Sequence, residues 1–277
     1  MKFYSPLRYP GGKTFLSRKF ESIISAVGLY KPIYVEPYAG GAGAALSLLF
    51  AEKVERIVIN DLDNAIYAFW KSVTEKSELF AQKILITPIT IAEWKKQKLV
   101  YSDKNSSYFE RGFATFFLNR TNRSGVMNAW PIGGMLQAGV YKMNARYNKD
   151  DLVERVRKIG ELKSRIEVLN EDGIQLTKRY LCQKNTFIYL DPPYFNKGAM
   201  LYLNHYDETD HKELANLLNT NADHHWVLTY DEVGKIRNLY LARKRKRLAL
   251  KYRVHDSNHV RKARELMIFS DSIIICE

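Results

Sequence analysis

Four consecutive residues, Asp191, Pro192, Pro193 and Tyr194, carry the clearest chemical signal in the chain. They follow an apolar run, 186–190, that predicts a buried strand, and open α/β sheets bind ligands at the carboxyl ends of their strands. The two prolines remove two N–H donors, so the turn presents carbonyl oxygens and one carboxylate. Such an acceptor-only pocket suits an amine that has to shed positive charge, and Tyr194 adds a flat face for a planar base. The alternative is a rigid turn without chemistry.

A glycine-rich loop near the N-terminus is the second candidate, and it lies in a strand–loop–helix–strand order. The predicted elements are, in turn, 33–36, 37–43, 44–51 and 56–60. Gly40, Gly41 and Gly43 would let the backbone approach a ligand closely. Asp61 ends the second strand, where a carboxylate typically binds ribose hydroxyls. The pattern fits a dinucleotide, an adenosine or S-adenosylmethionine equally well, and a plain tight turn is the alternative.

Two further segments could contribute to a site. The run Arg-Tyr-Pro-Gly-Gly-Lys at 8–13 offers Tyr9 to stack on a cofactor and Lys13 to neutralise its carboxylate, and a loop without function is the alternative. The segment 229–231 ends another predicted strand, and it could line a pocket for a base.

A parallel sheet would bring these segments together, because the carboxyl ends of its strands lie on the same side. Strand and helix patterns alternate, which predicts βαβ units with right-handed crossovers and an α/β fold. Further strands are predicted at 166–169, 226–229 and 265–269, and a further helix at 211–219. The intervening stretch has helical periodicity. We therefore expect a catalytic domain of residues 1–64 and 156–277, split by an insertion of residues 65–155.

The composition of the insertion indicates a polar partner. Residues 113–148 are basic and punctuated by glycine, with Trp130 and Tyr141 interleaved, which predicts a loop or hairpin. The whole chain has 43 Lys and Arg against 30 Asp and Glu, a net charge of +13. A phosphate backbone is the natural partner for this surplus, and an acidic membrane surface is the alternative. The densest charge run, 243–247, predicts a solvated or phosphate-facing edge.

Composition also excludes several classes of protein. Of the 277 residues 46% are hydrophobic, but no apolar run approaches the roughly 20 residues that span a bilayer. The first residues lack the apolar core of a secretory signal, so we expect a cytoplasmic protein. Cys182 and Cys276 lack the local pairing of a zinc site, so we expect buried thiols and no metal.

Taken in order, the motifs resemble those of the Dam-type (class alpha) adenine-specific DNA methyltransferases. R-Y-P-G-G-K at 8–13, E-P-Y-A-G-G-A-G at 36–43, N-D at 60–61 and D-P-P-Y at 191–194 follow the family's order. The insertion matches the place of the family's target-recognition region, so the resemblance covers nearly the whole chain. It implies a Rossmann-like methyltransferase sheet with an inserted, mainly helical recognition domain that carries a hairpin.

The resemblance also implies roles for individual residues. The catalytic positions correspond to Asp191, Pro192, Pro193 and Tyr194, and the cofactor-binding positions to Tyr9, Lys13, Gly40, Gly41, Gly43, Asp61, Asp172 and Asp191. Asp172 would meet the cofactor's adenine, although a solvated surface acid explains it equally well. The implied reaction moves a methyl group from S-adenosylmethionine to the exocyclic amine of an adenine flipped out of duplex DNA, without a metal.

The recognition region departs from that of Dam itself. Asn119-Arg120 is followed by T-N-R-S-G-V-M, and P-I-G-G and G-V-Y-K come later. This resembles a branch linked to restriction–modification systems, so the target need not be Dam's G-A-T-C. Arginine pairs with guanine and asparagine with adenine in the major groove, and the expected DNA contacts are Arg120, Asn122, Arg123, Asn128 and Lys142. The alternative is that these residues contact phosphates or support the hairpin.

We expect double-stranded DNA as the partner, a cognate restriction endonuclease if the branch is right, and a monomer, with a dimer as the alternative. Four rival functions remain in view. Enzymes that methylate protein glutamine carry Asn before the prolines, so Asp191 argues against them. A catalytically silent DNA-binding module and a nicotinamide-dependent dehydrogenase both leave D-P-P-Y unexplained. Methylation of RNA would use the same residues and stays open.

Overall fold

The computed structural model describes residues 4–8, 12–195, 206–252 and 261–274, and a seven-stranded sheet lies at its centre. The strands are β1 (Ile33–Glu36), β2 (Arg56–Asn60), β3 (Ile166–Leu169), β4 (Thr186–Leu190), β5 (Trp226–Asp231), β6 (Lys244–Tyr252) and β7 (Arg261–Phe269). Six of them contain the apolar runs that were predicted as strands, and β6 was not predicted. The glycine-rich loop leads into α2 (Gly43–Phe50), and the predicted helix at 211–219 is part of α10 (Glu208–Thr220). The predicted α/β fold class is therefore confirmed.

The order of the strands creates a place for a ligand. It runs β3-β2-β1-β4-β5-β7-β6, with β1 to β5 parallel and β7 antiparallel to both of its neighbours. From β1 the chain builds outward to β2 and β3, and from β4 it builds outward in the other direction. The crevice at the carboxyl ends of β1 and β4 is thus the switch point at which open α/β sheets bind ligands.

Alternate residues of each strand feed two cores on opposite faces of the sheet, as pleating requires. Tyr34 and Phe187 belong to one core, which α1 (Ser17–Ala26) and α2 cover. Their neighbours Val35 and Ile188 belong to the other core, which is covered by α8 (Gly173–Leu181), α10 and α11 (Gly234–Leu239). The sheet therefore lies between two helical layers.

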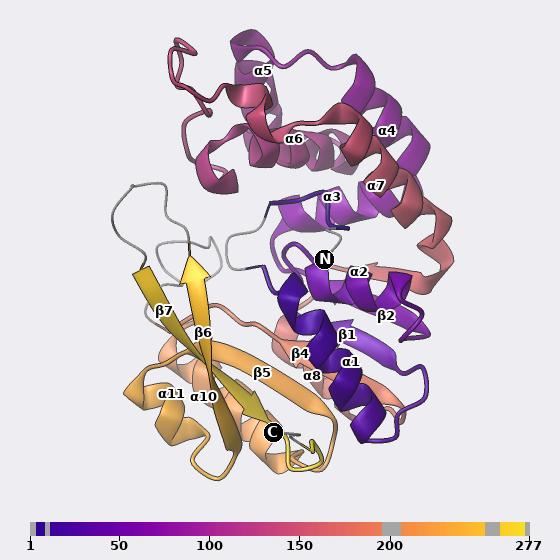
Figure 1. The fold of residues 1–277 in the computed structure, drawn as a ribbon, viewed down its shortest axis with the longest axis vertical. Coiled ribbons are helices and arrows are strands. Elements are labelled where there is room, and N and C mark those ends of the chain that lie inside the picture. The colour runs from indigo at the N-terminus through magenta and orange to yellow at the C-terminus, as the bar shows by residue number, and fades with distance from the viewer. Residues whose placement is uncertain (1–3, 9–11, 196–205, 253–260, 275–277) are drawn as a thin grey trace.

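The stretch between β2 and β3 forms a helical layer of its own, seen at one end of the molecule in Figure 1. Its helices are α3 (Asn64–Glu75), α4 (Ser77–Ile86), α5 (Ile91–Ser102), α6 (Tyr108–Thr121) and α7 (Lys149–Glu161). Helix α6 packs against α3 and α5, and α4 packs against α7. The aromatic side chains of Phe69, Phe80 and Phe116 meet within the first core, so the helices share one apolar core with the sheet.

Two expectations differ from the structure, the hairpin and the buried thiols. The expected hairpin is a loop closed by a single antiparallel bridge between Asn122 and Pro131, because α6 ends at Thr121 and the 3-10 turn η2 (Arg123–Gly125) starts directly after Asn122. The charge run at 243–247 agrees with the predicted solvated edge, because residues 244–247 are exposed on the edge strand β6. Cys182 is exposed rather than buried, and Cys276 lies outside the described residues. Within the ranges given above, no helix has the length and apolar character that crossing a membrane requires.

The contact between α3 and α6 depends on a small residue. A Cβ atom on Gly112 would lie 2.4 Å from the carbonyl oxygen of Ala68 and 2.7 Å from Oγ of Ser72. We expect Gly112→Ala to lower the free energy of unfolding by about 1–3 kcal/mol, the usual cost of overpacking. Gly234→Ala is the matched control, because a Cβ there meets no atom within 4 Å. Chemical denaturation of both variants tests this, and equal stability of the two would contradict the packing described.

Candidate active site

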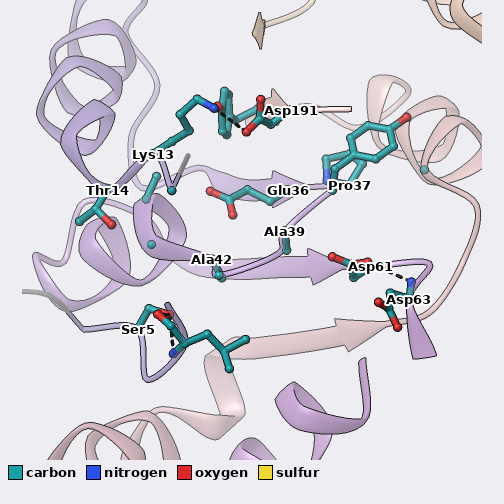
Figure 2. A pocket seen from close by; sticks show the side chains of 18 of the residues that line it. Ser5, Lys13, Thr14, Glu36, Pro37, Ala39, Ala42, Asp61, Asp63 and Asp191 are labelled. Carbon is teal, nitrogen blue, oxygen red and sulfur yellow. Dashed lines mark hydrogen bonds and ion pairs between the residues drawn. The ribbon is translucent and has the colours of Figure 1, made fainter. Parts of the chain in front are cut away.

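A pocket of about 600 Å³ opens at the switch point, and the carboxyl ends of the parallel strands supply much of its wall. Acidic side chains gather there from four strand ends: Glu36, Asp61, Asp172 and Asp191. Figure 2 shows Lys13 reaching toward Asp191 at one side of the pocket, with Asp61 and Asp63 at another. The volume suits a small-molecule ligand of the size of a nucleoside cofactor.

Lys13 joins the N-terminal segment to the D-P-P-Y turn. Its Nζ lies 2.8 Å from Oδ2 of Asp191 and 3.3 Å from Oε2 of Glu265, and it donates to the hydroxyl of Tyr194 at 3.0 Å. Only 5% of the Lys13 side chain and 2% of the Glu265 side chain are exposed. Burial lowers the pKa of Lys13, but the carboxylates of Asp191 and Glu265 outweigh it and raise that pKa above its usual value. Lys13 therefore stays protonated beside the pocket.

The other carboxylate oxygen of Asp191 is held from the next strand. Oδ1 accepts a hydrogen bond of 2.6 Å from Oγ1 of Thr229 on β5, and that hydroxyl also lies 2.8 Å from the hydroxyl of Tyr189. Each carboxylate oxygen has two lone pairs, so Asp191 can still accept from a ligand. Pro192 is buried and Pro193 lines the pocket. The turn thus presents a fixed carboxylate to the pocket.

The glycine-rich loop is tied to the acid that follows β2. The amide of Gly40, which has a φ of +45° that favours glycine, donates to Oδ2 of Asp61 at 2.9 Å. Asp63 N–H donates to Oδ1 of the same carboxylate at 3.0 Å. Burial raises the pKa of Asp61 to about 7, although these amide donors lower it. Gly41 and Gly43 line the pocket beside this pair.

Glu36 ends β1 in the wall of the pocket, between Lys13 and the glycine-rich loop (Figure 2). Its Oε1 accepts from the hydroxyl of Tyr34 at 2.8 Å and from the amide of Ala45 at 3.2 Å. Burial raises the pKa of Glu36 to about 8, and these two donors do not offset it. A cationic ligand in the pocket would favour the ionised form of this carboxyl.

Asp172 caps the N-terminus of α8 and also lines the pocket. Its Oδ1 accepts from the amides of Ile174 and Gln175, both at 3.0 Å. Next to it a Cβ on Gly173 would lie 2.4 Å from the ring of Tyr38, so a side chain there would displace a pocket aromatic. The cap gives Asp172 a structural role that does not exclude contact with a ligand.

The N-terminal segment is held by the helical insertion. The side-chain amide of Asn119, on α6, accepts from the Arg8 N–H at 2.6 Å and donates to the Arg8 carbonyl at 2.8 Å. Tyr9 lies outside the described residues, so its expected stacking on a cofactor is not tested. Lys13, four positions further along, reaches the pocket beside Asp191.

The residues expected to contact DNA fall into two groups. Asn122 is fully buried, accepts from Nε1 of Trp94 at 2.6 Å, and donates to the carbonyls of Val126 and Met127. Arg120 is 8% exposed and donates to the carbonyl of Pro6 at 2.6 Å. Asn122 thus holds the loop and Arg120 holds the N-terminal segment, and their burial argues against direct base contact. The exposed side chains are Arg123, Asn128 and Lys142.

Sequence reasoning missed Glu36 and Glu265 as site residues. Glu36 had a usable signal, since it ends the strand that leads into the glycine-rich loop. Glu265 had none, because it reaches Lys13 only through the antiparallel placement of β7 beside β5. Within the described parts of the chain, no group of three or more His, Cys, Asp and Glu side chains could hold a metal ion.

The sheet order and the pocket at its switch point define a Rossmann-like methyltransferase fold. The chain belongs to the D12 class N6 adenine-specific DNA methyltransferase family, whose model matches residues 9–255. It is therefore an enzyme of adenine-specific DNA methylation, and its family implies DNA as the substrate and S-adenosylmethionine as the methyl donor.

Among solved structures the chain is similar to the rRNA methyltransferase AviRa from Streptomyces viridochromogenes, with 13% identity and a TM-score of 0.42. That match covers 95% of this chain and 87% of the other chain, and at this level it carries no information about the substrate. No curated protein sequence matches the chain.

The raised pKa of Glu36 predicts a pH dependence of stability. A carboxyl whose pKa is raised on folding stabilises the protein below its unfolded value, near 4.5, and loses that contribution as the pH rises through about 8. Glu36→Gln keeps an oxygen acceptor for Tyr34 and Ala45 but cannot ionise. Between pH 5 and 8 the unfolding free energy of the wild type should fall more steeply than that of the variant, by roughly 1 kcal/mol per pH unit.

Chemical denaturation at several pH values measures this difference. Glu75→Gln, at an exposed position on α3, is the control and should leave the wild-type slope intact. An identical slope for the wild type and Glu36→Gln would show that the carboxyl titrates normally in the folded protein.

Proposed function

We propose that this enzyme transfers a methyl group from S-adenosylmethionine to the exocyclic amine of an adenine that is flipped out of duplex DNA. The observation that carries the proposal is the carboxylate of Asp191, fixed by Lys13 and Thr229 at the carboxyl end of β4 and facing the pocket. Adenine inside a duplex could not reach this carboxylate, so the base has to leave the stack.

The residues of the pocket fit the donor. Gly41 and Gly43 would let the protein backbone come close to the donor. Asp61 would accept from ribose hydroxyls, and Asp172 would lie toward the adenine ring. Tyr34 and Ala45 both donate to Oε1 of Glu36, so Oε2 would accept from the ammonium group of the methyl donor. When bound, the donor supplies an electrophilic methyl group.

The D-P-P-Y turn would act on the base. Asp191 and the carbonyl of Pro192 accept hydrogen bonds from the exocyclic amine and draw its lone pair out of conjugation with the ring. Tyr194 offers a face for stacking, while Lys13 and Asp191 hold its hydroxyl. Preorganised acceptors of this kind need no reorganisation during the reaction, so positioning and charge stabilisation supply the catalysis.

The helical layer would recognise the target. We assign residues 65–155 to a recognition domain and residues 1–64 with 156–277 to the catalytic domain. Arg123, Asn128 and Lys142 are the exposed candidates for contacts with DNA, Asn122 supports the loop that carries Arg123 and Asn128, and Arg120 supports the N-terminal segment. The restriction–modification branch, a cognate endonuclease and a monomeric state stay predictions.

Transfer of a tritiated methyl group from S-adenosylmethionine tests this function. Purified enzyme is given unmethylated plasmid DNA, or RNA of matched length and base composition, as separate substrates. We expect incorporation into DNA alone. Incorporation into RNA alone, with the methyl donor bound, would contradict the proposed substrate.

Asp191→Ala tests the catalytic role. Removing the carboxylate should lower kcat by roughly 10³-fold or more, the order of effect seen when an electrostatic or acid–base group is lost. Lys13 keeps Glu265 as a partner, so the variant should still fold, and its thermal unfolding verifies this. Asp223→Asn, at an exposed position after α10, is the control with unchanged turnover. Wild-type turnover in Asp191→Ala would refute the mechanism.

A further inference from the structure

Four arginines line the same pocket as the carboxylates of the strand ends. Arg8 lies in the N-terminal segment, Arg120 at the end of α6, Arg146 in the 3-10 turn η3 (Met143–Arg146) and Arg155 on α7. Positions this far apart in the chain meet because α6, η3 and α7 surround the N-terminal segment. Neither the methyl donor nor the base, as assigned above, uses these side chains.

The positive charge of this arginine cluster is poorly balanced within the parts of the protein that the structure describes. Arg155 has a carboxylate partner, Asp151, at 2.8 Å. Arg120 is 8% exposed, and its guanidinium donates to the carbonyls of Pro6 and Arg146 rather than to an acid. Nη1 of Arg8 and Nε of Arg155 are buried without a hydrogen-bond partner. Buried charged donors of this kind are costly unless an anion satisfies them.

The arginines also repel one another. Burial, then Arg155 and Arg8, lower the pKa of Arg120 to about 9. Burial and Arg146 lower the pKa of Arg8. A bound oxyanion would relieve this repulsion between the arginine side chains of the pocket wall. The planar guanidinium group also matches the geometry of a phosphate.

We propose that the arginine cluster binds one backbone phosphate of the DNA strand whose base enters the pocket. The proposal rests on the proposed function and adds a contact that fixes the position of the flipped nucleotide. A phosphate contact carries no sequence information, so the cluster would hold every target strand alike. It would lie between the surface that reads the target and the carboxylate that acts on the base.

The carboxylate of the methyl donor is the other oxyanion that could reach this pocket. A phosphate is favoured because Arg146 is exposed and ends η3, the turn that directly follows the loop of residues 126–142. That loop presents Leu136 and Val140, which are 91% and 93% exposed, so it is an unpartnered surface at the same end of the molecule. A DNA strand that continues outside the pocket could therefore reach the arginine cluster.

The test uses Arg146→Gln and the double variant Arg8→Gln/Arg146→Gln, because the buried Arg120 supports the fold. Arg157→Gln is the control, since Arg157 lies on α7 but pairs with Glu78 and does not line the pocket. Fluorescence anisotropy gives the affinity for a labelled duplex between 50 and 200 mM salt, and calorimetry gives the affinity for S-adenosylmethionine.

We expect Arg146→Gln to bind the duplex roughly tenfold more weakly, as for a lost hydrogen bond between charged groups. The slope of log K against log salt should become shallower by about 0.9 for a lost phosphate contact. Affinity for S-adenosylmethionine should match that of the wild type and of Arg157→Gln.

Weaker binding of S-adenosylmethionine with an unchanged salt slope would assign the cluster to the donor's carboxylate and overturn the proposal. An unchanged salt slope and unchanged donor affinity in both variants would overturn it as well. In both cases methylation of DNA by the wild type would leave the proposed function standing. If the wild type neither bound nor methylated duplex DNA, the proposed function itself would fail.

Discussion

The buried ammonium of Lys13 lies between the carboxylates of Asp191 and Glu265, and the arrangement of the site depends on this contact. It joins three parts of the chain that are distant in sequence: the N-terminal segment, the turn after β4 and the antiparallel strand β7. The two carboxylates compensate the buried charge of the ammonium group. Removing one partner of a buried ion pair typically lowers the free energy of unfolding by about 3–5 kcal/mol. The position of the Asp191 carboxylate is therefore fixed by the same interaction that joins β7 to the N-terminal segment.

The parallel sheet explains why the remaining acids converge. The carboxyl ends of strands β1 to β4 lie on the same side of the molecule. Glu36, Asp61 and Asp191 therefore face one pocket, although up to 155 positions separate them in the chain. The helical insertion contributes to the opposite wall of the pocket, where Asn119 forms two hydrogen bonds with the backbone of Arg8. Acidic groups from the sheet and basic groups from the helices thus line one cavity, which suits a cationic methyl donor together with an anionic strand.

Much of this was predictable from sequence, because the strands are apolar runs and the acids follow directly after them. What was not predictable depends on tertiary contacts. Asn122 has the chemistry of an adenine reader, yet Trp94 and two loop carbonyls occupy its amide. Glu265 reaches the site only because β7 is inserted antiparallel between β5 and β6. The expected hairpin is reduced to one bridge, because Asn122 lies between the end of α6 and a 3-10 turn and neither side is extended.

The most direct test of the central claim is the identity of the methylated atom. Plasmid DNA incubated with the enzyme and S-adenosylmethionine is digested to nucleosides, and the products are identified by mass spectrometry. An acceptor-only turn built around Asp191 predicts a methyl group on the exocyclic amine of adenine, and none on carbon. Methyl groups on a ring carbon, which require a covalent nucleophile rather than hydrogen-bond acceptors, would contradict the account.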